Sequence, residues 1–166
     1  MDRPKHMHKS MWPRYVKACF QAGVDPDRVT QTQGSAPASA GTHGRDGFFT
    51  NENGNQESYS AALDLSVKNS RLTKAQREAL LIALWENGFC AWYRQAPEFP
   101  GNEHIHCVAA SLIMKRSLRN QVHDFLAHRS GLVSDKSDAF VCQNLTEATE
   151  QKLRTEFLQS GNPITG

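Results

Sequence analysis

Apolar and polar residues alternate along residues 59–67, the pattern of a strand with one buried face. The leucines on either side of Asp64 fall on the apolar face, and Asp64 itself falls on the polar face. Residues 89–94 are rich in aromatic side chains and predict a second strand, and a third is expected over 104–110. A proline-bearing loop separates these two segments.

Apolar residues at helical spacing predict helices between and around the strands. The clearest begins at a capping box formed by Thr73 and Gln76 and ends at Gly88, where a C-cap glycine is favoured. Three more helices are expected: at 14–22, around Leu118, and after Thr146. The pattern therefore predicts an α+β fold, in which helices pack on one face of a small antiparallel sheet.

The polar segment 30–58 interrupts this pattern and is expected to be a long functional loop or an insertion. Residues 1–10 are expected to form a disordered tail. A chain of 166 residues is long enough for one hydrophobic core, so residues 1–166 are expected to form a single domain.

Composition limits the classes of partner that the chain is expected to bind. The formal net charge is +2 and the basic residues are scattered, so no nucleic-acid partner is expected. No apolar run has the length of a membrane span, and the basic N-terminus lacks a signal-peptide core, so we expect a soluble chain without a membrane partner. We expect a monomer. The four cysteines are widely spaced and are interpreted as buried free thiols.

Candidate chemistry centres on His104 and His106, which share one face of their predicted strand because strand side chains alternate. Asp64 lies on the polar face of another predicted strand, which can pair with the first. Imidazole nitrogen and carboxylate oxygen are zinc ligands, so these strands predict half of a divalent-metal site. Alternatively, the histidines are solvent-facing strand residues without a ligand.

Three stretches carry a family resemblance: 60–65 (SAALDL), 88–94 (GFCAWYR) and 104–108 (HIHCV). Their order and spacing resemble the metal-binding core shared by hedgehog signalling domains and D-Ala-D-Ala peptidases. With the intervening helix they cover about a third of the chain. The resemblance implies one Zn²⁺ ion, with Asp64 and His106 as ligands and His104 as a catalytic neighbour.

The family's first ligand is a histidine seven positions before the aspartate, where this chain has Glu57. Two substitutes remain open: Glu57 itself, or His43 if the segment between His43 and Asp64 is an inserted loop. We favour His43, because imidazole preserves the family's ligand chemistry.

The resemblance also implies a general base and a substrate-binding surface. Glu103, three positions before His106, matches the base of the peptidases, while Glu98 resembles a more distant glutamate of hedgehog proteins. Asp46 remains a third candidate. Arg94 is expected to hold a substrate carboxylate, and Trp92 to line the cleft.

These inferences predict a zinc-dependent D,D-carboxypeptidase or endopeptidase acting on peptidoglycan stem peptides. Synthesis in the cytoplasm, with delivery to the cell wall by lysis or a secretion system, would reconcile that substrate with the absence of a signal peptide. A second hypothesis is a non-catalytic, metal-containing module with a hedgehog-like fold that binds a peptide or protein. A third is a metal-free scaffold whose segment 30–58 grips a protein.

Overall fold

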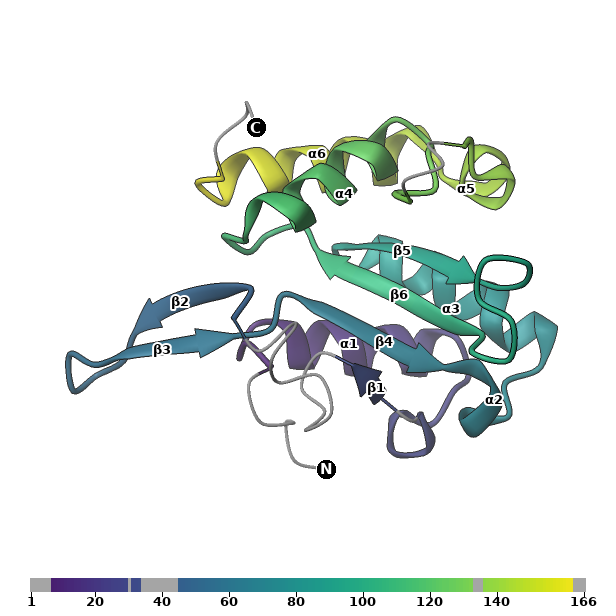
Figure 1. Cartoon of the computed structure of the whole chain (residues 1–166), viewed down its shortest axis with the longest axis horizontal. Helices are drawn as coiled ribbons and strands as arrows, with labels where there is room; N and C mark the ends of the chain where they lie inside the picture. The colour runs from purple at the N-terminus through teal and green to yellow at the C-terminus, as the bar shows by residue number, and fades with distance from the viewer. Residues whose placement is uncertain (1–6, 30, 34–44, 133–135, 163–166) are drawn as a thin grey trace.

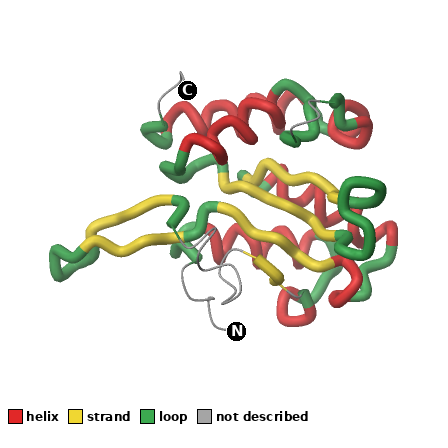
Figure 2. The backbone as a smooth tube through the Cα atoms, in the orientation of Figure 1, coloured by secondary structure: helices red, strands yellow, loops and turns green. Residues whose placement is uncertain are grey.

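The structure, a computed structural model, describes residues 7–29, 31–33, 45–132 and 136–162. It confirms the α+β prediction, with helices packed on an antiparallel sheet (Figures 1 and 2). The helices are α1 (Met11–Gln21), α2 (Val67–Ser70), α3 (Lys74–Glu86), α4 (Arg116–Leu126), α5 (Ala139–Asn144) and α6 (Glu147–Gln159), and a 3₁₀ turn, η1, spans Pro26–Arg28. Among the described residues, no helix is long and apolar enough to cross a membrane.

The main sheet has the strand order β1-β4-β6-β5, and neighbouring strands run antiparallel. The strands are β1 (Gln31–Gln33), β4 (Ala62–Ser66), β5 (Phe89–Arg94) and β6 (His104–Ala109). The register pairs Asp64 with His106, and His106 with Trp92. Paired residues point to the same face, so this register brings the three side chains into one row.

Helices cover both faces of this sheet. Tyr93 of β5 contacts Arg77 of α3, with the guanidinium carbon 4.0 Å from the ring centroid. The preceding residue, Trp92, packs edge-to-face against Phe125 of α4 at 5.2 Å between centroids. Successive strand residues face opposite ways, so α3 and α4 lie on opposite faces. The predicted helical layer, formed by α1 and α3, is therefore joined by α4 across the sheet (Figure 1).

Part of the segment predicted as a loop or insertion forms a hairpin of β2 (Gly47–Thr50) and β3 (Gln56–Tyr59), which projects from the body of the protein (Figure 1). The Asn51 side chain organises its turn, since Oδ1 accepts hydrogen bonds from the N–H groups of Asn53 and Asn55. Local turn chemistry therefore produces ordered strands within a polar composition.

The predicted disordered tail is wrong from residue 7 onward. Met7 is only 1% exposed and forms a bridge with Ser60. Helix α1 begins at Met11, and its buried residues include Tyr15 and Cys19. Apolar side chains near the N-terminus thus join the core, which offsets the entropy of ordering this segment.

Candidate functional site

Asp64 of β4 and His106 of β6 form the centre of the site. Oδ1 of Asp64 lies 2.6 Å from Nδ1 of His106, and both residues are less than 10% exposed. Their strands are paired at these two positions, so the backbone register fixes this contact. The sheet therefore holds a carboxylate oxygen and an imidazole nitrogen side by side in a buried position.

The second ring nitrogen of His106 faces helix α4. Nε2 lies 2.7 Å from Oε1 of Gln121. If Oε1 accepts the Nε2 proton, a second proton must lie between Nδ1 and the Asp64 carboxylate, on the ring or on the carboxyl group, because two lone pairs do not approach to 2.6 Å. If the Gln121 amide group donates instead, Nδ1–H donates to Asp64. The orientation of the Gln121 amide and the protonation of the His106 ring are thus linked.

His104 lies one strand repeat away on the same face. Its Nδ1 is 2.7 Å from the carbonyl oxygen of Asn102, which can only accept, so Nδ1 carries a proton. Nε2 lies 3.9 Å from Oδ2 of Asp64. The ring of Phe99 packs edge-on against His104. The neutral ring therefore directs its Nε2 lone pair toward Asp64, and the protonated ring directs an N–H there.

Trp92 and Arg94 of β5 continue this surface. The Trp92 ring stacks on His106 with centroids 5.9 Å apart, and its Nε1 donates to the carbonyl oxygen of Arg129. Arg94 lies over the Trp92 ring and donates to the carbonyl oxygen of Ser130. Trp92 thus contacts both the His106 ring and the guanidinium of Arg94.

Burial lowers the pKa of the Arg94 guanidinium to about 10, because the charged form loses solvation. Three carboxylates act in the opposite direction: those of Asp138, Asp64 and Glu98. The charge of Arg94 therefore persists at neutral pH, surrounded by acidic groups from three parts of the chain. Such a guanidinium can bind a substrate carboxylate if the pocket beside it admits one.

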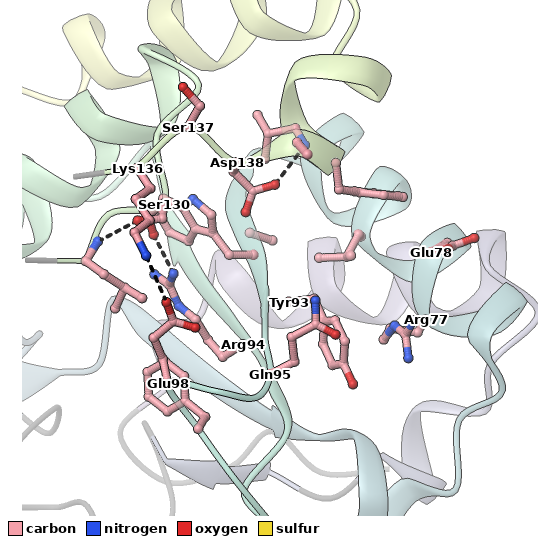
Figure 3. Close-up of a pocket in the computed structure, with 18 of the residues that line it drawn as sticks. Arg77, Glu78, Tyr93, Arg94, Gln95, Glu98, Ser130, Lys136, Ser137 and Asp138 are labelled. Carbon is pink, nitrogen blue, oxygen red and sulfur yellow. Dashed lines mark hydrogen bonds and ion pairs between the residues drawn. The ribbon is translucent and has the colours of Figure 1, made fainter. Parts of the chain in front are cut away.

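That pocket has a volume of about 540 Å³ and lies beside β5 (Figure 3). Trp92 and Arg94 contribute to its wall, together with residues of α3, the loop after β5 and the start of α5. Asp64 and His106 are not among its lining residues. The pocket and the Asp64–His106 pair are therefore distinct places that share Trp92 and Arg94.

Of the two residues proposed as the third ligand, the structure describes Glu57. Glu57 is exposed on the projecting hairpin, and its Oε1 accepts a hydrogen bond from the Asn51 side chain, which corrects its assignment as a ligand beside Asp64. His43 lies outside the described residues. Within the described part of the chain, no three His, Cys, Asp or Glu side chains form a group that could hold a metal.

The two candidate general bases Glu103 and Glu98 lie in different parts of the structure. Glu103 is half-buried immediately before β6, and its carbonyl oxygen accepts a hydrogen bond from the Val67 N–H. Glu98 lines the pocket, where its carboxylate lies 4.0 Å from the Lys136 ammonium. Of the two, Glu103 is nearer in sequence to the histidines, and Glu98 is nearer in space to Arg94.

Asp46, the third candidate base, is a buried structural group. Its Oδ2 accepts a hydrogen bond from the Ala61 N–H at 3.0 Å, and its Oδ1 lies 2.8 Å from the Lys115 ammonium. Its carbonyl oxygen also accepts from the Lys115 N–H. These contacts fasten the base of the hairpin to β4 and the start of α4, which corrects the assignment of Asp46 as a possible base.

Comparison of the chain with protein-family models, with curated proteins and with solved structures gives no match. Function is therefore inferred from the geometry of Asp64, His104 and His106, from the pocket, and from the sequence motifs. Site residues that the sequence did not reveal include Gln121, Ser130 and Asp138. Each is a polar residue on a helix or loop, without a spacing pattern that distinguishes it from a surface residue.

Proposed function

We propose that the protein is a zinc-dependent peptidase that cleaves peptidoglycan stem peptides, with Asp64, His106 and His43 as the zinc ligands. One observation carries the proposal: Oδ1 of Asp64 lies 2.6 Å from Nδ1 of His106, while Gln121 is placed to accept a proton from Nε2. A metal-binding histidine commonly donates its other N–H to a side chain or carbonyl group. The donor set of carboxylate and imidazole fits zinc.

A zinc ion at this place would supply Lewis acidity, which activates water near neutral pH and polarises a carbonyl group. The chain's own residues would do the rest. His104, held by Asn102, would place Nε2 near the reacting carbonyl group, where its protonated form stabilises negative charge. Arg94 would hold a carboxylate of the peptide, and Glu103 would accept and return a proton.

The proposal is tested by incubating the zinc-loaded full chain with purified peptidoglycan fragments and measuring released amino acids and peptides by mass spectrometry. We expect turnover that Glu103→Gln reduces by about 10²–10⁴-fold, the usual contribution of a general base. Glu98→Gln tests the alternative base, and Glu52→Gln, on the exposed hairpin, is the matched control. No release from any fragment by the zinc-loaded protein would contradict a peptidase.

The second candidate is a metal-containing module that binds a peptide without cleaving it. It is favoured by Glu103, because among the described residues it is the backbone carbonyl of Glu103, not its carboxylate, that accepts a hydrogen bond. Under this hypothesis peptidoglycan fragments co-elute with the zinc-loaded protein from a size-exclusion column, and no amino acid or peptide is released from them. Retention without release would therefore replace the first proposal with the second.

A further inference from the structure

Strand β5 is an edge of the main sheet, because it pairs with β6 on one side. The carbonyl oxygen of Gly88 accepts a hydrogen bond from the Ala110 N–H, which sets the phase of the ladder. In an antiparallel pair, alternate residues direct their backbone groups to the partner strand. Trp92 and Arg94 therefore direct theirs to β6, whereas Ala91 and Tyr93 direct theirs outward.

The two outward positions differ. The carbonyl oxygen of Ala91 accepts a hydrogen bond from Nε1 of Trp85, so helix α3 covers this part of the edge. Among the hydrogen bonds of the described chain, none pairs the outward N–H and C=O of Tyr93. Tyr93 is half-buried and lines the 540 Å³ pocket. One residue of the edge thus offers both a donor and an acceptor to whatever occupies the pocket.

The pocket is suited to a short extended chain. Its volume falls within the range of about 300–1,000 Å³ typical of ligand sites. Aromatic residues contribute to its lining, and charged residues that include Arg77, Arg94 and Glu98 line it as well (Figure 3). The aromatic residues are Trp85, Trp92, Tyr93, Phe99 and Phe140. Backbone groups at a sheet edge bind an added strand, and pockets on alternating sides select its side chains.

The charge of Arg77 bears on which side chain an added strand could place opposite Tyr93. A residue paired with Tyr93 points to the same face, where the guanidinium of Arg77 lies over the Tyr93 ring. The carboxylate of the neighbouring Glu78 lies 3.8 Å from the Lys74 ammonium, and Arg77 forms no ion pair with another described residue. On the other face Glu98 is paired with Lys136. A negative side chain opposite Tyr93 would therefore meet a half-buried guanidinium.

We propose that this pocket binds an extended peptide that adds to β5 as a fifth strand, with an acidic residue paired to Tyr93 and facing Arg77. The Tyr93 N–H donates to the peptide carbonyl, and the peptide N–H donates to the Tyr93 carbonyl oxygen. The site does not depend on the proposed zinc chemistry. Binding is expected in metal-free protein.

The test uses the full chain and an acetylated, amidated pentapeptide, Thr-Val-Glu-Val-Thr, whose affinity is measured by calorimetry. Replacing the central Glu with Gln should weaken binding by about fivefold, in keeping with one partly exposed ion pair. N-methylation of the central amide should weaken it by at least about tenfold, because that amide can no longer donate. The Tyr93 amide signal in nuclear magnetic resonance spectra should shift on binding.

A charge exchange makes the test specific. Arg77→Glu should lose affinity for the Glu peptide and prefer the same peptide with a central Lys. Lys17→Glu, at an exposed position of α1, should leave both affinities unchanged. The proposal would be overturned if the wild-type chain bound neither the Glu peptide nor the Lys peptide. It would also be overturned if N-methylation and Arg77→Glu left the affinities unchanged. Sedimentation analysis adds one more outcome: a dimer that buries β5 and that the peptide does not dissociate would also overturn it.

Discussion

Asp64 and His106 occupy paired positions on neighbouring antiparallel strands, and this pairing holds Oδ1 and Nδ1 2.6 Å apart. Neither side chain reaches the other from a loop, so both positions are fixed by the main sheet. Sites built on regular elements hold their geometry more closely than sites on loops, because the backbone ladder limits displacement. The main sheet therefore preorganises this hydrogen-bonded carboxylate–imidazole pair.

Gln121 tunes this pair, so its removal is expected to weaken metal binding. Gln121→Leu deletes the group facing Nε2 of His106 and should reduce zinc affinity by about 10–100-fold, the usual effect of losing a partner of a ligating histidine. Competition with a chelator of known affinity measures this change. Gln159→Leu, at an exposed position of α6, is the control. Unchanged zinc affinity in Gln121→Leu would show that the amide has no part in ligand orientation.

Asp46 is expected to matter for stability rather than for proton transfer. Asp46→Asn removes the charge facing Lys115 in a buried place and should lower the free energy of unfolding by about 1–3 kcal/mol. Urea unfolding followed by circular dichroism measures this, with Asp27→Asn, on the exposed η1 turn, as the control. Equal loss of stability in both variants would contradict a structural role for the Asp46–Lys115 contact.

The contact between His128 and Glu150 predicts a pH dependence. The hydrogen bond from His128, at 2.9 Å, is the main reason that the pKa of Glu150 is lowered below its ordinary value of 4.5. A carboxyl group whose pKa is lower in the folded chain than in the unfolded chain stabilises the fold at pH values above the unfolded-state pKa. This stabilisation is lost as the pH falls through the folded-state pKa. Glu150→Gln should therefore lower the melting temperature at pH 6.

That difference between Glu150→Gln and the wild-type chain should shrink as the pH is taken below 4.5. Glu147→Gln is the matched control, because Glu147 lies in the same first turn of α6 and shares its helix-dipole environment. Melting temperatures followed across this pH range test the pair. A Glu150→Gln deficit that is constant from pH 6 to pH 3 would contradict the assigned role of the His128 contact.

The sequence was sufficient for the elements whose signals are local. The capping box of Thr73 and Gln76 forms as predicted at the start of α3, and the aromatic segment 89–94 is β5. Alternation also placed Asp64 and His106 on polar faces of separate strands. Because antiparallel pairing brings equivalent faces together, the contact between these two residues followed from the pattern once the strands were adjacent.

Other features depend on contacts between distant segments. Gln121 lies on the polar side of an amphipathic helix, where it cannot be distinguished from a solvent-facing residue until α4 is placed against β6. The polar composition of the hairpin does not predict strands, although Asn53 followed by Gly54 is a turn signal. Its attachment through Asp46 to Lys115 joins parts of the chain that no local pattern relates.

The most direct test of the account is the zinc content of the purified full chain after loading and removal of excess metal, measured by mass spectrometry of the elements. We predict one zinc ion per chain, lost in Asp64→Ala and in His106→Ala but retained in the controls Asp27→Ala and His123→Ala, both at exposed positions. Circular dichroism confirms that each variant is folded. A folded wild-type chain without zinc, or equal zinc content in the double variant Asp64→Ala/His106→Ala, would contradict the proposed metal site.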